Sequence, residues 1–397
     1  MLAQERKMAF VAGPRQVGKT TLARTLLNET GSGQGYFNWD IEPHRRAIIR
    51  SPVDFWAAAA LNTTDPHIVL DEIHKYPRWK RFLKGLYDAS AESVRMIVTG
   101  SGRLDIYQRG GDSLLGRYNL YRLHPFTVGE LLKTNRDSLR PPEKALRKIL
   151  SDAPPAGAKE ALESIEKFTG FPEPLFAAST SRLQRWRTAR HHLVLREDLR
   201  DLTRIRELGL IESLVSILPD RVGSPLSLNA LREDLGVAFG SVRDWVLALG
   251  RLYYLFEIRP YAGNLARTLR REAKVYLFDG SDIEQEGARF ENLVALHLLK
   301  ACDAWTDMGF GEFTLHYVRD KEKRKADFLI VRNRKPWLLI EAKQSSLNSA
   351  PALSYFHARL KSSYAFQVVR DIPAAFLSRR VGGVTVVSAA RFLACLP

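Results

Sequence analysis

A glycine-rich run near the start of the chain has the residue types and spacing needed to hold a phosphate group. In the pattern G-x-x-x-x-G-K-[ST], the glycines let the backbone wrap an anion, the lysine reaches the β- and γ-phosphates, and the hydroxyl binds Mg²⁺. Lys19 and Thr20 would have these last two roles. The alternative is a glycine-rich turn before a surface helix. The loop and the residue after it are Gly13, Pro14, Arg15, Gln16, Val17, Gly18, Lys19, Thr20 and Thr21.

Two neighbouring carboxylates could work with this loop. Residues 67–75 begin as an apolar run typical of a buried parallel strand, and the run ends at Asp71 and Glu72. An open α/β sheet binds its ligand at the carboxyl ends of its strands. We therefore expect Asp71 to hold the hydration shell of Mg²⁺ and Glu72 to polarise the water that attacks the γ-phosphate. The alternative is a pair of carboxylates that caps a helix start.

The surrounding elements are those that such a site needs. Residues 8–12 read as a strand before the loop and residues 21–27 as a helix after it. Further strands are expected at residues 36–40 and 94–98, residues 114–123 read as a loop that enters a fifth strand, and residues 43–61 are mainly helical. Polar side chains after residue 98, Thr99 and Ser101, could sense the γ-phosphate or position the water.

These motifs occur in an order that resembles a family of bacterial and archaeal AAA+ ATPases. The order runs from the phosphate loop through the Leu-Asp-Glu-Ile strand and the Thr-Gly-Ser strand to Gly-Arg and residues 123–131. In that family an AAA-type domain is joined to a C-terminal domain of unassigned function. The Gly-Phe-Pro-Glu sequence at residues 170–173 and the strand at residues 274–279 look like later signatures of the family.

The resemblance implies an ATPase that works at subunit boundaries. ATP and Mg²⁺ would be its cofactors, and the chain would form a homo-oligomeric ring, a hexamer. An arginine before the fifth strand typically reaches the γ-phosphate bound by a neighbouring subunit, and Arg117 is similar in position. Arg103 is the other contender, and pairing of Arg117 with a local carboxylate is the alternative.

The composition favours a polyanionic partner. The formal net charge is +16 and the isoelectric point about 9.9, which suits nucleic acid and would also suit an acidic protein or a membrane surface. The two cysteines form no disulfide framework and no zinc pattern. No segment is long and apolar enough to span a bilayer, and nothing resembles a signal peptide, so we expect a cytoplasmic protein without a membrane partner.

The middle of the chain reads as helical. Residues 132–167 turn polar and carry Pro-Pro pairs, which predicts a link out of the nucleotide domain. Residues 182–205 are rich in arginine. That run is consistent with a solvated surface, a face toward ATP, a subunit contact or a nucleic-acid track. Its arginines are Arg182, Arg185, Arg187, Arg190, Arg196, Arg200 and Arg204.

A helix-turn-helix pattern follows. Residues 227–236 predict a first helix, residues 236–238 a turn and residues 239–249 a second helix, and strands at 252–258 and 274–278 would complete a wing. Such a winged helix could bind DNA or serve as a packing module within an assembly. The arginines that would face DNA are Arg243, Arg267, Arg270 and Arg271.

The last segment carries a second possible site. A helix at residues 287–299, strands at 313–318, 326–331 and 336–342, a helix at 351–360 and a strand at 365–369 give the order α-β-β-β-α-β. This order resembles the PD-(D/E)xK nuclease core, a restriction-endonuclease-like α/β fold.

The spacing of the charged residues fits that chemistry. Side chains two apart on a strand share a face, so Glu341 and Lys343 would point into one site, with Asp327 on the adjacent strand. Asp327 and Glu341 could bind a second Mg²⁺ or Mn²⁺, Lys343 could orient the attacking water, and Glu291 could add a carboxylate. A relic without activity is the alternative. The basic residues at 319–325 suit a phosphate-rich partner or an ordinary charged hairpin tip.

We therefore predict an α/β multidomain protein. Its parts would be an AAA+ P-loop ATPase domain with a parallel sheet and flanking helices (residues 1–135), a helical lid or linker (136–210), a winged-helix-like domain (211–280) and a PD-(D/E)xK nuclease-like domain (281–397). Three functions remain open: a ring-forming ATP-driven machine on nucleic acid, an ATP-regulated deoxyribonuclease in defence or mobile-element biology, and a non-hydrolysing ATP-bound switch that controls a partner.

Overall fold

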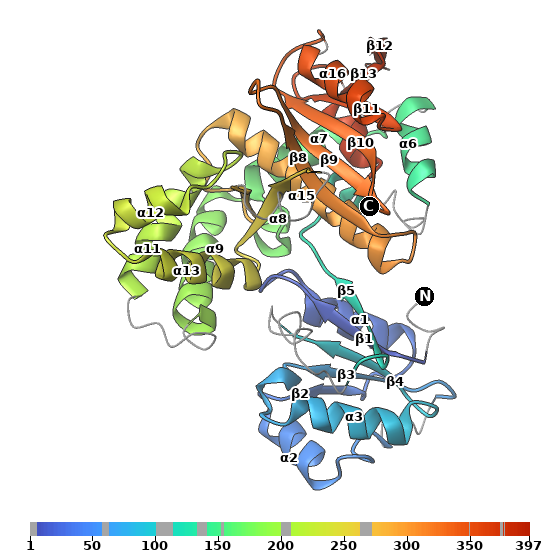
Figure 1. Ribbon diagram of the computed structural model, residues 1–397. Coiled ribbons are helices and arrows are strands. Elements are labelled where there is room, and N and C mark those ends of the chain that lie inside the picture. The colour runs from blue at the N-terminus through green and yellow to red at the C-terminus, as the bar shows by residue number, and fades with distance from the viewer. Residues whose placement is uncertain are drawn as a thin grey trace. The chain divides into compact units, whose positions relative to one another are not determined.

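A computed structural model describes most of the chain (Figure 1). The described residues are 6–57, 63–100, 114–132, 141–151, 155–199, 208–262, 272–348, 350–373, 376 and 378–397. They divide into two compact units, residues 1–124 with 251–253 and residues 125–250 with 254–397. Several residues singled out in the sequence lie outside the described part: Ser101, Arg103, Arg200, Arg204, Arg267, Arg270 and Arg271.

A parallel sheet forms the centre of the first unit. Within the described residues its order is β2-β3-β4-β1-β5, and every pair of neighbours is parallel. The strands β1 and β3 are buried along their whole length, as expected of a sheet covered on both faces. All carboxyl ends therefore lie along one edge. The bounds are β1 Met8–Ala12, β2 Tyr36–Asn38, β3 His67–Asp71, β4 Arg95–Thr99 and β5 Tyr118–Arg122.

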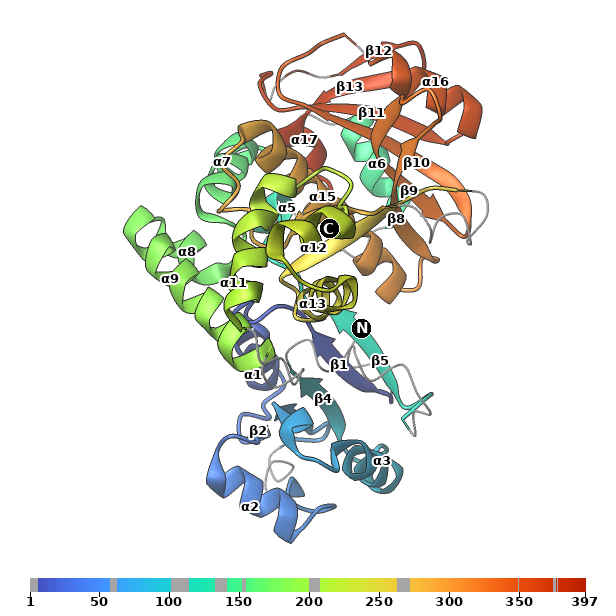
Figure 2. The same cartoon turned by 60° about the vertical axis from the view of Figure 1, so that its left-hand side comes forward.

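Helices cover the two faces of this sheet (Figure 2). Helix α1, Lys19–Glu29, packs Ala23 and Leu27 into one core, and helix α3, Trp79–Ser90, packs Leu83 and Leu86 into the other. Helix α2 spans Glu42–Arg50, and a short 3₁₀ turn spans Ile73–Lys75.

The helix expected at residues 43–61 is shorter than predicted. It ends at Arg50, just before Ser51 and Pro52, because the residue before a proline is driven out of the helical region. The chain continues in turns through residues 52–56. The strand expected at residues 36–40 also ends early, at Asn38, and the strand predicted at residues 67–75 gives way to the 3₁₀ turn after Asp71.

The second unit begins with helices. The stretch expected to be a linker, residues 132–167, contains α6 and α7, and Pro142 opens α6. The bounds are α5 Val128–Leu131, α6 Pro142–Ser151, α7 Ala158–Phe168, α8 Pro172–Ala177, α9 Thr180–His192, a π-helical stretch Leu193–Asp198, α11 Leu208–Ile217, a 3₁₀ turn Leu218–Arg221, α12 Leu228–Leu235 and α13 Phe239–Arg251.

A mixed sheet completes the second unit (Figure 1). Its order within the described residues is β12-β13-β11-β10-β9-β8-β6-β7. The elements from α15 to β11 follow the predicted order α-β-β-β-α-β. The bounds are β6 Leu255–Pro260, β7 Lys274–Leu277, α15 Glu286–Asp307, β8 Phe313–Arg319, β9 Lys325–Arg332, β10 Lys335–Lys343, α16 Pro351–Leu360, β11 Tyr364–Val369, β12 Arg379–Val381, β13 Val384–Ser388 and α17 Ala389–Ala394.

The hairpin predicted as a wing belongs to this same sheet. Strand β6 pairs with β7 in antiparallel fashion and with β8 in parallel fashion. The sheet is therefore continuous across residue 280, where the sequence suggested a domain boundary. The four-part division of the chain stays a prediction.

Candidate functional site

The glycine-rich loop lies between β1 and α1 and passes close to other backbone. Gly13 has φ 155° and Gly18 has φ 101°, both in a region that favours glycine. A Cβ at Gly13 would lie 2.2 Å from the carbonyl oxygen of Leu123. Val17 is buried, whereas Gln16, Thr20 and Thr21 are exposed. The loop conformation therefore depends on the glycines of the motif.

Lys19 is folded over the loop. Its Nζ donates hydrogen bonds to the carbonyl oxygens of Gly13, at 3.0 Å, and Pro14, at 2.7 Å. Only 9% of the residue is exposed. The ammonium group is thus held where it could contact a bound phosphate. Its present acceptors are carbonyl oxygens, which are weak bases, and a phosphate anion could replace them.

Asp71 accepts hydrogen bonds from hydroxyl groups of several elements. Thr20 Oγ1 of α1 donates to Oδ2 at 2.8 Å, Thr99 Oγ1 of β4 to Oδ1 at 2.5 Å and Tyr36 Oη of β2 to Oδ2 at 2.7 Å. The carboxylate is 3% exposed. The predicted magnesium residues Thr20 and Asp71 are therefore in direct contact, and their hard oxygens are the ligands that Mg²⁺ prefers.

Tyr36 was not singled out in the sequence. It pairs in register with Val69, two residues before Asp71, so the two side chains lie on one face of neighbouring strands. Burial, partly offset by Asn38, raises the pKa of the phenol, and Asp71 raises it further. The sequence places Tyr36 at the start of a strand, but the strand order that sets it beside β3 is a property of the fold.

Glu72 follows directly after β3. Its φ of 55° is unusual for a residue with a side chain, and its amide donates to the carbonyl oxygen of Thr99 at 3.1 Å. Burial raises the pKa of the carboxyl group, and the ammonium of Lys75, 3.3 Å from Oε2, acts in the opposite direction. A partly desolvated carboxylate beside the candidate metal residues suits a general base.

Arg117 lies at the opposite edge of the sheet. It directly precedes β5, and its carbonyl oxygen accepts a hydrogen bond from the amide of Met8 at the start of β1. Its guanidinium donates to both carboxylate oxygens of Asp88, at 2.7 and 3.2 Å. The local pairing considered as an alternative is therefore present, and Arg117 cannot serve the phosphate loop of its own sheet, which lies at the carboxyl edge.

The arginine-rich helix α9 is not simply a solvated surface. Arg190 is 1% exposed, and its guanidinium lies 4.6 Å from the ring centre of Phe171 and 5.6 Å from that of Trp186. Arg187 forms an ion pair with Asp282. The Phe of the Gly-Phe-Pro-Glu sequence therefore has a packing role in the second unit.

The helix-turn-helix pattern is present as α12, a turn and α13. Ser227 Oγ accepts from the amide of Ala230 at 3.4 Å at the start of α12, and Gly236, with φ 66°, ends that helix. Arg243 on α13 pairs with the adjacent Asp244 at 2.9 Å. Any contact of Arg243 with DNA stays a prediction.

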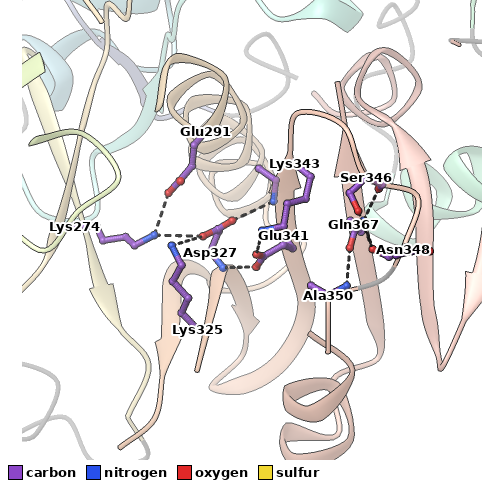
Figure 3. Close-up of polar contacts among 11 residues, drawn as sticks. Lys274, Glu291, Lys325, Asp327, Glu341, Lys343, Ser346, Asn348, Ala350 and Gln367 are labelled. Carbon is purple, nitrogen blue, oxygen red and sulfur yellow. Dashed lines mark hydrogen bonds and ion pairs between the residues drawn. The ribbon is translucent and has the colours of Figure 1, made fainter. Parts of the chain in front are cut away.

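The predicted nuclease residues come together in the second unit (Figure 3). The amide of Asp327 on β9 donates to Glu341 Oε2 on β10 at 3.2 Å, and Lys343 Nζ lies 2.7 Å from Glu341 Oε1. Glu291 reaches the same region from α15, where Lys274 Nζ of β7 lies 3.0 Å from Glu291 Oε1 and 3.5 Å from Asp327 Oδ1. Lys274 and Tyr276, whose hydroxyl donates to Glu291 Oε1 at 2.7 Å, were not predicted here.

Burial controls the electrostatics of this cluster. Desolvation and the nearby Asp327 raise the pKa of Glu291 and of Glu341, and the lysines oppose this shift. Within the described residues, no group of three His, Cys, Asp or Glu side chains is arranged to hold a metal ion. The expected second metal site is therefore not shown.

Gln367 on β11 supports the neighbouring loop. It is fully buried and lies in register with Glu341. Its Nε2 donates to the carbonyl oxygens of Ser346 and Asn348, at 2.7 and 2.9 Å, and its Oε1 accepts from the amide of Ala350 at 2.8 Å (Figure 3). The loop after Lys343 is thus tied to the sheet.

Comparison with family models gives two matches. Residues 5–132 match the model of an AAA domain, and residues 161–281 match that of a domain of unknown function, DUF8612. Among helices of the described residues, none is long and apolar enough to cross a membrane.

Two mycobacterial proteins are similar in sequence. They are the uncharacterized protein Rv2008c of Mycobacterium tuberculosis and the uncharacterized protein Mb2031c of Mycobacterium bovis, each 25% identical over 276 residues. The match spans 68% of this chain and 54% of each relative, so the chain spans about half the length of these relatives.

Solved structures give only distant similarities. The Aeropyrum pernix ORC1 protein in complex with DNA has a TM-score of 0.32 and 16% identity, over 73% of this chain and 86% of that one. Drosophila ORC bound to DNA has a TM-score of 0.24 and 14% identity, over 69% and 87%. Both scores are too low to establish a shared overall fold. Residues 5–132 are therefore similar in sequence to an AAA domain, and the parallel sheet and phosphate loop of this part of the chain agree with that similarity.

Proposed function

We propose that the chain is a Mg²⁺-dependent AAA+ ATPase that assembles into a hexameric ring and acts on nucleic acid in the cytoplasm. The observation that carries this proposal is the hydrogen-bonded set of Thr20, Asp71 and Thr99 beside the phosphate loop, with Glu72 next in sequence. These side chains come from α1, β3 and β4, and they meet at the carboxyl edge of the sheet.

Each residue of the site has a role in hydrolysis. Bound Mg²⁺–ATP would supply the phosphoanhydride bond that is broken. Lys19 would exchange its bonds to Gly13 and Pro14 for bonds to phosphate oxygens, and Thr20 and Asp71 would hold the metal and its waters. Glu72 would accept the proton of the attacking water, because its partly desolvated carboxylate is more basic than an exposed one.

Nucleic acid is the proposed substrate class for reasons of charge and fold. The net charge of +16 favours a polyanion, and the α12–α13 pair followed by the β6–β7 hairpin has the order of a winged helix. Val222 and Pro225 form bridges to β7, which ties the segment before α12 to this hairpin.

Substitution of Glu72 by Gln tests the catalytic part of the proposal. Glu72→Gln should bind ATP as the wild type does but lose about 10²- to 10⁴-fold in turnover, because the general base is gone. Nucleotide binding is measured by titration of a fluorescent ATP analogue, and turnover by phosphate release. Lys19→Ala is the contrasting variant, which should lose triphosphate binding itself.

The same experiment separates the ATPase from a non-hydrolysing switch. A switch would bind ATP tightly with negligible turnover in the wild type as well. Full turnover in Glu72→Gln would instead show that Glu72 is not the general base.

A second candidate function is metal-dependent cleavage of DNA, under the control of ATP. This function is favoured because Asp327, Glu341 and Lys343 lie close together on the adjacent strands β9 and β10. Glu291 reaches the same region from α15. In this reading Lys343 would orient the attacking water while the carboxylates bind Mg²⁺ or Mn²⁺.

A further inference from the structure

Lys274 points from the start of β7 into the carboxylate cluster of the nuclease-like fold (Figure 3). Its Nζ donates to Glu291 Oε1 at 3.0 Å and lies 3.5 Å from Asp327 Oδ1. The ammonium therefore bridges a carboxylate of α15 and a carboxylate of β9. This is the position between carboxylates that a divalent cation would need.

This lysine is built into the core rather than lying on the surface. Its side chain is 4% exposed, and its Nζ lies 5.6 Å from the ring centre of Tyr317. Asp327 is equally buried, and among the described residues its Oδ1 has no hydrogen-bond donor. A buried carboxylate oxygen without a donor is costly unless a cation faces it, and Lys274 is the buried cation that does so.

The charges of the cluster are already compensated. Lys274 faces Glu291 and Asp327, and Lys343 faces Glu341 at 2.7 Å. Lys325 adds a third ammonium at 4.0 Å from Asp327 Oδ1, from a side chain that is 59% exposed. A divalent cation that entered this cluster would meet the charge of Lys274 at contact distance, where repulsion between like charges is strong.

We propose that Lys274 occupies the position of a divalent cation in the nuclease-like site and keeps the folded chain closed to Mg²⁺ and Mn²⁺. The inference rests on the second candidate function, because it gives the reason why that function would be latent. Cleavage would require Lys274 to leave Glu291 and Asp327.

Manganese binding to the full chain without nucleotide tests the proposal. Free Mn²⁺ is followed by electron paramagnetic resonance during titration of the wild type, Lys274→Met and Lys274→Met combined with Asp327→Asn. We expect Lys274→Met to gain one site at least about tenfold tighter than any in the wild type, a difference of about 1.4 kcal/mol. The combined variant should lose that site, which locates it at Asp327.

Lys325→Met is the matched control. It removes an ammonium group near the same carboxylate oxygen, but one on an exposed side chain. It should gain no manganese site, because Lys274 remains in place. A gain as large as that of Lys274→Met would show that net charge alone decides binding.

Thermal unfolding keeps the test decisive if Lys274→Met is unstable. Mn²⁺ should raise the melting temperature of Lys274→Met, or of Lys274→Gln if the Met variant fails to fold, and should leave that of the wild type unchanged. Saturable Mn²⁺ binding to the wild type that Asp327→Asn abolishes would overturn the proposal. So would a folded Lys274 variant that gains no site.

Plasmid nicking separates this inference from the function on which it rests. Nicking by Lys274→Met with Mn²⁺, and none by the wild type, would support both. Manganese binding by Lys274→Met without nicking would support the exclusion of the cation by Lys274. It would contradict the nuclease function. Loss of ATP turnover in Glu72→Gln is independent of either result.

Discussion

Asp71 is the residue on which the candidate nucleotide site depends. A single buried carboxylate fixes hydroxyl groups from α1, β2 and β4, and each of these donors is at least 28 residues from Asp71 in the sequence. A carboxylate that accepts hydrogen bonds from several donors is held in one orientation. A metal site needs its ligands to be oriented in this way before the metal binds.

Tyr36→Phe tests whether the hydroxyl of Tyr36 supports Asp71. Removing it should raise the Mg²⁺ concentration for half-maximal ATP turnover about tenfold, because groups that orient a metal-binding carboxylate typically affect metal affinity by this order. ATP turnover is measured at a series of Mg²⁺ concentrations. Tyr76→Phe, which alters a ring stacked 4.6 Å from Trp39, is the control and should leave the Mg²⁺ dependence unchanged. An unchanged dependence in Tyr36→Phe would mean that the hydroxyl only fills space.

The sequence allowed the prediction of residues that belong to local motifs. Lys19, Thr20, Asp71 and Glu72 could be proposed for the nucleotide site because a loop, or a strand end, places them through short-range geometry. Tyr36 and Lys274 could not, because each acts across strands whose neighbours are set by sheet order.

Elements in the second unit are joined by buried polar contacts. His297 on α15 accepts a hydrogen bond from the amide of Val128 at 3.2 Å through Nε2, and its Nδ1 donates to the carbonyl oxygen of Leu293 at 2.8 Å. Lys300, one turn further, donates to the carbonyl oxygen of Pro125 at 3.0 Å. Helix α15 thereby fixes the start of α5.

His297 should make the second unit less stable in mild acid. Burial lowers the pKa of His297 from its ordinary value of 6.5 to about 4. Between these values the unfolded chain binds a proton that the folded chain does not, so stability is full above about pH 6.5 and falls as the pH drops toward 4. At pH 5 this linkage lowers the free energy of unfolding by about 2 kcal/mol.

Urea unfolding at pH 7.5 and pH 5 measures this effect. His297→Gln retains an acceptor for the amide of Val128 but does not titrate. Between the two pH values its free energy of unfolding should therefore fall by about 2 kcal/mol less than that of the wild type. Equal losses in both proteins would show that another group controls the acid sensitivity.

Helix and strand order followed from periodicity, whereas several element ends did not. The α-β-β-β-α-β series could be predicted since each element has its own apolar pattern. The end of α2 at Arg50 depends on Pro52, and the helices α6 and α7 lie in a stretch whose prolines suggested a linker. The parallel pairing of β6 with β8 is a long-range contact that no local sequence pattern predicts.

At the scale of the whole molecule, the two units hold different chemistry. The first has the phosphate loop and its carboxylates, and the second has the buried cluster of Glu291, Asp327 and Lys274. Arg117 lies at the sheet edge opposite the phosphate loop of its own chain, so in the proposed ring it would serve a neighbouring subunit. The pairing with Asp88 would have to open in that assembly.

ATP hydrolysis as a function of protein concentration is the most direct test of this account. Turnover per subunit should rise cooperatively with concentration, increase further with duplex DNA, and fall about 10³-fold or more in Arg117→Ala, the loss typical of a missing arginine finger. Arg95→Ala, which removes another arginine paired with a surface carboxylate at the amino-terminal edge of the sheet, is the control and should retain activity. Flat activity that is insensitive to DNA and unchanged in Arg117→Ala would contradict the account, because each chain would then contain a complete site of its own.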